Sequence, residues 1–417
     1  MAVSKQRASF MWLLAAGFFF AEYFARVAPS VMATPLMATF HVHAFALGSL
    51  SAFFYYAYLI MQIPAGAMID VISTKKLLSL MAILCGISSY LFSLSNTLYA
   101  AEINRVVMGF SAAFAFVGAL KIARQWFPSY RFGLLAGATQ ALGMLGAAVG
   151  EGPVAMLVTH YGWQQTMQWI SYVLFIIGIG LFIIIKDKPQ PHSLKTPWRT
   201  TYQAVIMIKD VLSHRPTWIN GIFAGLLYAP TAAFAELWGP SYLHTVYHIP
   251  LTVAADAVSL IFIGWAIGGP IAGWISDRIQ RRKPIMWVSS VLSLLLMAII
   301  LYFPNLSEIT LFVLLFLYGI ANVAVAITYV VAAEINPKAV AGTAMGFTNM
   351  ASVIIGASFQ PIIGKLLDLQ WNGATHLGAP AYTPLNYKTA MMCIPICTLL
   401  AIVMCAFIKE SFQKPST

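Results

Sequence analysis

Two residues of opposite charge lie one helical turn apart within a long apolar stretch near the start of the chain. Glu22 and Arg26 are separated by four positions inside the apolar run at 10–37, so a helix presents both on one face, with Tyr23 beside them. A charge at the centre of a bilayer is costly unless it is paired or faces water. We therefore expect Arg26 to bind the carboxylate or phosphate of a solute and Glu22 to bind a proton. The alternative is an ion pair that only packs the helices.

Four further polar residues lie inside other apolar stretches. Glu236 occupies in the second half the position that Arg26 occupies in the first, so it is expected either to face the same central site or to pair with Arg26. Glu151 has a neutral counterpart, Gln360, which indicates a titrating role, with gating and packing as alternatives. Arg105 needs a carboxylate or carbonyl partner within the membrane, so its role is either proton coupling or structural.

Metal, disulfide and nucleotide chemistry are not expected. Most of the eight histidines fall in predicted outer loops, and no Walker-type, zinc-protease or nucleophile-elbow motif occurs in the sequence. We therefore expect no metal, no cofactor and no enzymatic activity. Three charged residues near the outer helix ends are expected to be solvated, namely Asp256, Lys365 and Asp368. The four cysteines lie inside predicted helices and are expected to be packed thiols: Cys85, Cys393, Cys397 and Cys405.

The elements that carry these residues are predicted from composition. The 417 residues are 60% hydrophobic and only 9% charged, whereas a soluble domain carries roughly a quarter charged residues. Twelve apolar stretches are each long enough to cross a hydrocarbon core of about 30 Å as a helix. An all-α membrane protein is therefore predicted. The stretches lie at 10–37, 46–70, 77–95, 100–124, 132–158, 165–185, 217–243, 253–276, 285–303, 308–333, 341–367 and 388–408.

The basic residues indicate how the chain lies in the membrane. A net charge of +11 is compatible with nucleic-acid binding, but most of the 24 Lys and Arg residues fall in every second loop. This distribution follows the positive-inside rule and places both termini in the cytoplasm of a bacterial-type inner membrane. We therefore expect membrane lipids and no nucleic acid as partners.

An internal repeat divides the chain into two halves. Gly66-x-x-x-Asp70 recurs as Gly273-x-x-x-Asp277, and each copy runs into basic residues at the end of an apolar stretch. The predicted organisation is a first bundle of six helices at 1–186, a linker at 187–216 and a second bundle of six at 217–417. The linker carries several prolines and bases, and a short amphipathic helix is expected within it at 198–212.

The repeated loop motif resembles that of the major facilitator superfamily, and the resemblance covers essentially the whole chain. It implies two pseudo-twofold-related six-helix bundles and alternating access, with the loop residues acting in gating rather than in solute binding. Arg105 and Gly109 are similar to the family's motif in the fourth helix. Val71 departs from the family pattern, which often has Arg there, so weaker closure of the cytoplasmic side is expected in the first half. The gating residues implied by the resemblance are Gly66, Asp70, Lys75, Lys76, Gly273, Asp277, Arg278, Arg281 and Arg282.

These observations predict a secondary transporter. The glycine and proline signature of drug antiporters is poorly matched, which favours import, and the first and seventh helices distantly resemble nutrient-uptake members, including phagosomal nutrient transporters. We expect a monomer that imports a small zwitterionic or anionic nutrient, such as an amino acid, a short peptide or an organic acid, together with protons. A proton-driven efflux antiporter for a drug, metabolite or metal chelator is the main alternative, and a signalling receptor with the same helices is a second.

Overall fold

The computed structural model describes residues 5–187, 209–303 and 305–412. Eleven helices in these residues are long and apolar enough to cross a membrane. One of them, α6 (Phe132–Ile184), has 53 residues, which at 1.5 Å per residue is about 80 Å and far exceeds one bilayer. Gly162 interrupts it with φ of 81°, a conformation that glycine adopts without strain, so α6 provides two spans. The described residues therefore provide twelve spans, as predicted.

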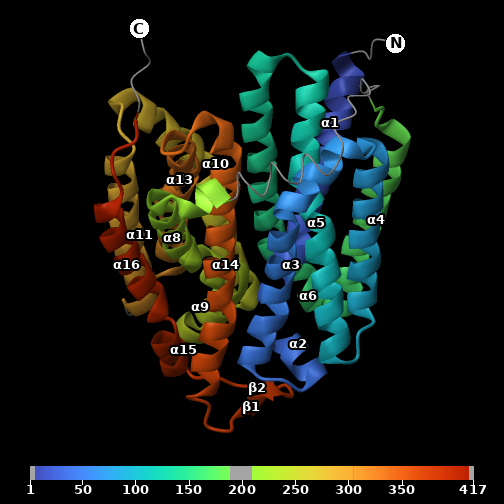
Figure 1. Cartoon of the computed structure of the whole chain (residues 1–417). Helices are drawn as coiled ribbons and strands as arrows, with labels where there is room; N and C mark the ends of the chain where they lie inside the picture. The colour runs from blue at the N-terminus through green and yellow to red at the C-terminus, as the bar shows by residue number, and fades with distance from the viewer. Residues whose placement is uncertain (1–4, 188–208, 304, 413–417) are drawn as a thin grey trace.

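The first half comprises the elements from α1 to α6, shown in blue to green in Figure 1. Within it α1 packs on α6 and α5, α3 packs on α5, and α4 packs on both α5 and α6. The elements before α6 are α1 (Lys5–Val27), η1 (Ala28–Ser30), α2 (Ala33–Phe40), α3 (Ala44–Val71), α4 (Thr74–Ser93), α5 (Leu98–Trp126) and η2 (Ser129–Arg131).

The second half comprises the elements from α8 to α16, and within it α8 packs on α14 and α16 while α10 packs on α12. Most of the predicted amphipathic helix and of the predicted linker lies outside the described residues, and the described end of that helix, 209–212, is helical. The elements are α8 (Arg215–Pro230), η3 (Thr231–Trp238), α9 (Gly239–Tyr247), α10 (Leu251–Ile279), α11 (Lys283–Tyr302), α12 (Glu308–Ala321), α13 (Ala324–Glu334), η4 (Lys338–Val340), α14 (Ala341–Asp368), β1 (Thr375–His376), β2 (Ala379–Pro380), α15 (Pro384–Ala390) and α16 (Cys393–Phe407).

Several stretches predicted as single helices are broken, and two of the breaks face each other. The run at 10–37 divides into α1, the 3-10 turn η1 and α2, where Pro29 lacks the N–H group that would continue the helix. The corresponding helix of the second half passes through η3, a π-helical segment that follows Pro230. The segments η1 and η3 are in contact. Irregular backbone at membrane depth is tolerated where protein or a cavity surrounds it, so these breaks mark the centre of the molecule.

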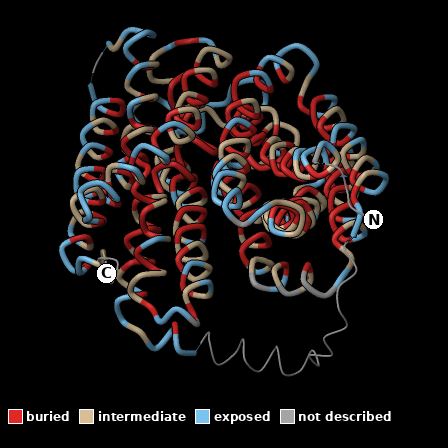
Figure 2. Tube along the Cα trace, turned by 90° about the horizontal axis from the view of Figure 1, so that it is seen from above, coloured by how far each residue is buried: buried red, intermediate tan, exposed pale blue. Residues whose placement is uncertain are grey.

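The two ends of the molecule differ. The start of α1 and the described end of the chain after α16 lie at one end, which we call the terminal face, and α2, α15 and the β1–β2 pair lie at the other, which we call the distal face (Figure 1). Figure 2 shows the molecule along the axis that joins these two faces. Buried positions line the sides on which helices face one another, and exposed positions lie mainly on outer sides and at helix ends.

The halves meet mainly through two helix pairs, α3 with α14 and α6 with α10. Near the distal face a Cβ atom on Gly48 of α3 would overlap the backbone of Gln360, and one on Gly364 of α14 would overlap that of Ala44. Gly66 and Gly346 lie about five turns nearer the terminal face on the same sides of these helices. Within the described residues, a Cβ atom on either would meet no heavy atom within 4 Å. Helices α3 and α14 are therefore in close contact near the distal face and separated from each other near the terminal face.

Candidate functional site

The predicted ion pair forms in the last two turns of α1, directly before the break at η1. Arg26 Nη2 lies 2.8 Å from Glu22 Oε1, and the two side chains are 6% and 0% exposed. Each also keeps a buried polar atom, Glu22 Oε2 and Arg26 Nε, for which the described residues supply no hydrogen-bond partner. Because an unpaired buried polar atom is unfavourable, the arrangement fits a site that water or a solute completes.

Aromatic rings from α1 and α3 surround the guanidinium of Arg26. Its Cζ atom lies 4.2 Å from the ring centre of Tyr23 and 4.6 Å from that of Tyr58. The rings of Phe54 and Tyr55 follow at 5.4 Å and 5.9 Å. Aromatic faces attract a cation and restrict its motion. We call these four rings the aromatic enclosure; of its members the sequence analysis identified only Tyr23.

Glu236 supplies a second carboxylate from the other half. It lies in η3, where the wider π-helical turn changes the direction of side chains, a feature frequent at functional sites. Tyr228 donates a hydrogen bond of 2.8 Å to its Oε1, while Oε2 is buried with no partner in the described part of the chain. Glu236 interacts electrostatically with Arg26 and Glu22 across the interface, and Tyr55 interacts with both Glu236 and Arg26. The structure thus brings together the three residues expected at a central site.

Arg105 anchors the backbone that carries this site. Its guanidinium donates hydrogen bonds to the carbonyl groups of Ala25 and Arg26 on α1 and of Leu50 and Ser51 on α3. The side chain is 1% exposed, so carbonyl groups supply the partners that a membrane arginine requires. The close approach of α5 to α3 depends on Gly109, where a Cβ atom would overlap the carbonyl of Phe54. This geometry favours the structural alternative for Arg105.

Glu151 and Gln360 lie nearer the distal part of the interface. Ser30 donates a hydrogen bond of 2.7 Å to Glu151 Oε1, and Glu151 Oε2 is buried without a partner among the described residues. Gln360 donates through Nε2 to the Ala232 carbonyl at 2.9 Å, and the backbone carbonyl of Gln360 accepts from the Trp238 indole N–H at 2.9 Å. Glu151 therefore adjoins η1 and Gln360 adjoins η3, and Glu151 also interacts electrostatically with Glu236.

The second loop motif forms a charged network at the terminal face. Arg282 pairs with Asp277 at 2.6 Å, as expected of a base near that aspartate, and with Glu334 at 2.9 Å. Hydrogen bonds to these two carboxylates raise the pKa of Arg282 against the opposing effect of its partial burial. Glu410 accepts hydrogen bonds from the backbone N–H groups of Arg282 and Lys283 at 2.7 and 3.2 Å. The sequence analysis missed Glu334 and Glu410, because no local spacing connects them to the motif.

The other predicted gating residues make fewer described contacts. In the first loop, Asp187 accepts hydrogen bonds from the Ser73 hydroxyl and from the Lys75 backbone N–H group. Lys76 donates its backbone N–H to the Ser73 hydroxyl, which caps α4. The side chain of Asp70 lies outside what the structure describes. In the second loop, Arg278 lies over the Trp274 ring at 5.5 Å and Arg281 accepts a hydrogen bond at its carbonyl from Ser276.

One expectation about a charged residue is wrong. Asp368 is not simply solvated, because its carboxylate accepts hydrogen bonds from the first two N–H groups of α3 in the other half. The four cysteines are free thiols inside helices, as expected. Within the described ranges, no cluster of three metal-ligating side chains is found.

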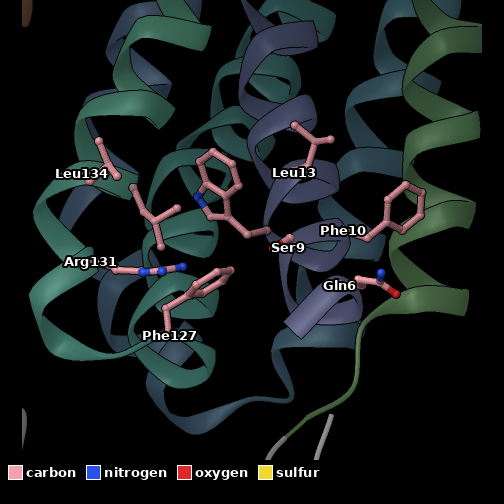
Figure 3. A pocket seen from close by; sticks show the side chains of 9 residues that line it. Gln6, Ser9, Phe10, Leu13, Phe127, Arg131 and Leu134 are labelled. Atoms are coloured by element: carbon pink, nitrogen blue, oxygen red, sulfur yellow. The ribbon is translucent and has the colours of Figure 1, made fainter. Parts of the chain in front are cut away.

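A separate crevice of ≈ 600 Å³ lies at the terminal end of the first half. Figure 3 shows Arg131 and Phe127 extending toward the side of α1 that carries Ser9. Glu22 is nine residues beyond Leu13 on the same helix, about 14 Å along its axis, so the crevice is distinct from the buried pair. Its lining comprises Gln6, Ser9, Phe10, Trp12, Leu13, Phe127, Arg131, Leu134 and Leu135.

Known proteins resemble this chain over most of its length. It is 24% identical over 384 residues to the membrane sensor protein UhpC of Escherichia coli K12, covering 87% of this chain and 86% of that protein. It is also 24% identical over 376 residues to the probable galactarate/D-glucarate transporter GarP of the same organism, covering 80% and 83%. Among solved structures, a bacterial homologue of the lysosomal transporter Spinster, in an inward-facing and occupied conformation, superposes with a TM-score of 0.80 at 14% identity over 97% of each chain.

These similarities agree with the twelve spans in two related halves and with the absence of an enzymatic motif in the sequence. A model of the Major Facilitator Superfamily matches residues 13–361. The chain therefore belongs to the Major Facilitator Superfamily, a family of membrane transporters and not of enzymes.

Proposed function

We propose that this protein imports a small anionic or zwitterionic solute across an inner membrane together with protons, by alternating access. One observation carries the proposal: Glu22, Arg26 and Glu236 form a buried charged cluster shared by both halves, and each keeps a polar atom without a partner among the described residues. A cluster that served packing alone would be expected to satisfy these atoms. Water and a solute are the partners that a transport site would supply.

Arg26 is the proposed anion-binding residue. The aromatic enclosure holds its guanidinium, while Glu22 occupies only one of its nitrogen atoms. A guanidinium presents several N–H donors in a plane and binds carboxylate or phosphate oxygens in pairs. A solute carboxylate that approaches the Nε side would compete with Glu22 for the same cation.

This competition gives a mechanism for coupling. When the solute binds Arg26, Glu22 loses part of its counter-charge in a buried position, and an unpaired buried carboxylate is strongly disfavoured. Proton uptake by Glu22 removes that penalty, so solute and proton bind together. Glu236 offers a second proton acceptor in the other half, where Tyr228 orients it. A proton entering down 100 mV contributes about 2.3 kcal/mol, enough for roughly fifty-fold accumulation of a zwitterion without net charge at one-to-one coupling, whereas import of an anion requires the pH gradient or further protons.

The difference between the two ends supports alternating access. The pair α3 and α14 is closed near the distal face and separated toward the terminal face. With both termini in the cytoplasm, as the basic loops predict, this is an inward-facing state. Proton and solute would bind in the outward-facing state, and a rocking motion of the halves would then give this inward-facing state, from which both are released to the cytoplasm.

Uptake by purified protein in liposomes tests the proposal. With an imposed pH gradient, acid outside, we expect accumulation of one member of a panel of radiolabelled sugar acids, amino acids, short peptides and hexose phosphates. D-glucarate is the first probe, because the relative GarP is named for galactarate and D-glucarate. Dissipating the gradient with a protonophore should abolish accumulation but leave exchange of labelled for unlabelled solute.

Two outcomes would favour other functions. Extrusion of the solute in exchange for protons would indicate the efflux antiporter. A saturable thermal shift or calorimetric binding signal without any flux would indicate a receptor, a function favoured by the likeness to UhpC, which is named a membrane sensor protein.

A further inference from the structure

The first turn of α3 is capped by a residue from the other half of the molecule. A helix N-terminus exposes N–H groups that lack partners within the helix and favours negative charge. His43, which precedes α3, provides no side-chain cap. Instead, the backbone N–H of Ala44 donates to Asp368 Oδ1 at 3.0 Å and that of Phe45 donates to Oδ2 at 2.9 Å. Each oxygen of one carboxylate thus binds one of these N–H groups.

The second half holds this carboxylate in place. The hydroxyl of Tyr382 donates to Asp368 Oδ1 at 2.6 Å and also accepts from the Ala44 N–H at 3.1 Å. Tyr382 is only 7% exposed, so its position is fixed by packing. Asp368, in the last turn of α14, therefore binds both N–H groups, and Tyr382, just before α15, binds that of Ala44 from the same side of the interface.

The surrounding contacts make the junction tight. Gly364 lies one turn before Asp368, and a side chain there would overlap the Ala44 backbone, so glycine lets α14 approach α3 closely enough for the cap. The rings of His43 and Trp371 meet edge to face at 4.6 Å. Lys365 lies 5.9 Å from the centre of the Phe45 ring. All of these contacts join the start of α3 to the end of α14 at the distal face.

We infer that Asp368, oriented by Tyr382, is the latch that keeps the distal face closed by capping α3 across the two halves. The inference rests on the proposed function, because only alternating access requires this face to open. Opening would break every cap bond at once and leave the N–H groups of α3 and the carboxylate to water. Asp368 is thus a positioning residue for the transport cycle, remote from the proposed solute site on Arg26.

Distances between two spin labels report whether the distal face is open or closed, and the measurement needs neither solute nor transport. One label would replace Tyr99 at the distal start of α5, 73% exposed, and the other Leu385 in α15, 70% exposed. The four native cysteines are first changed to alanine. We expect one short distance for the parent protein. In Asp368→Asn, which keeps the shape but loses the charge and one acceptor, we expect a second, longer distance and a rise on the order of tenfold in the ratio of open to closed molecules.

Two further variants make the result decisive. Tyr382→Phe should open the distal face in the same direction by less, because it leaves both Asp368 acceptors in place. Glu308, an exposed carboxylate in the first turn of α12, supplies the matched control, and Glu308→Gln should leave the distances unchanged. An unchanged distribution in folded Asp368→Asn, or in Tyr382→Phe if the first variant does not fold, would overturn the latch. Because the readout needs no transport, a failed uptake assay and a failed latch remain distinguishable.

Discussion

Glu22 and Arg26 are joined by a single contact, Nη2 to Oε1 at 2.8 Å, and each leaves a buried polar atom free of partners within the described part of the chain. An i, i+4 pair on a surface helix contributes only a few tenths of a kcal/mol. Here the same spacing occurs in a buried helix beside a third ionisable group, Glu236, from the other half. This arrangement supports the proposal that the pair is one state of an exchangeable site.

Removing the cation should abolish solute binding. We predict that Arg26→Ala binds the transported anion at least a hundredfold more weakly, since the loss of a buried charge-assisted pair costs about 3 kcal/mol or more. Arg26→Lys should retain partial binding, because it keeps the charge but not the planar array of donors. Calorimetric titration of both purified variants measures this. Unaltered affinity in Arg26→Ala would exclude Arg26 as a solute ligand.

Neutralising Glu22 should separate transport from proton coupling. In Glu22→Gln the amide cannot take up a proton, so we predict that solute exchange continues, while accumulation driven by a pH gradient equivalent to about 100 mV falls from roughly fifty-fold to equilibrium. Proton-driven uptake and counterflow would be measured in the same liposomes. Glu236→Gln provides the comparison for the second half. Normal gradient-driven accumulation in both variants would remove these carboxylates from the coupling mechanism.

Arg105 should matter for stability more than for proton coupling. Its replacement by alanine removes the hydrogen bonds that the guanidinium donates to four carbonyl groups on α1 and α3, so we predict a loss of about 3 kcal/mol in stability and a lower melting temperature. Arg105→Lys should recover part of it. Thermal melts in detergent measure the effect, and the ratio of protons to solute should not change in variants that remain folded. A changed ratio would instead assign Arg105 to coupling.

The carboxylate of Glu410 should hold the C-terminal segment on α11 in a pH-dependent way. Partial burial opposes ionisation, but N–H groups of Arg282, Phe412, Lys283 and Ser411 outweigh it and lower the pKa of Glu410 below its ordinary value of 4.5. The contact is therefore fully present above that value and is lost as pH falls through the lowered pKa. Glu410→Gln should mimic the loss at neutral pH, with about tenfold faster hydrogen exchange at Arg282 and Lys283. Unchanged exchange at both amides would contradict the cap.

Features that depend on local spacing were predictable from the sequence. The twelve spans, the repeated loop motif and the pair of Glu22 and Arg26 follow from apolar length, similarity between halves and helical geometry. The breaks at η1 and η3 were not predicted, because proline occurs in membrane helices without always ending them.

Contacts between distant helices could not be predicted in the same way. Tyr58 approaches Arg26 and Asp368 approaches α3 only after helices far apart in sequence have packed, and no periodicity encodes such pairs. The aromatic run from Phe53 to Tyr56 was a usable signal for the aromatic enclosure, since rings at consecutive positions must partly face the bundle interior. Glu334 and Glu410 gave no comparable signal.

Thiol accessibility at Tyr55 tests the central claim most directly. Tyr55→Cys, with the native cysteines replaced by alanine, places a thiol between Arg26 and Glu236. We predict that a membrane-impermeant thiol reagent modifies it from the side of the terminal face in oriented vesicles, and that the transported solute slows this reaction. Absence of modification from either side, with or without solute, would mean that the charged cluster is sealed from water and would contradict its assignment as a transport site.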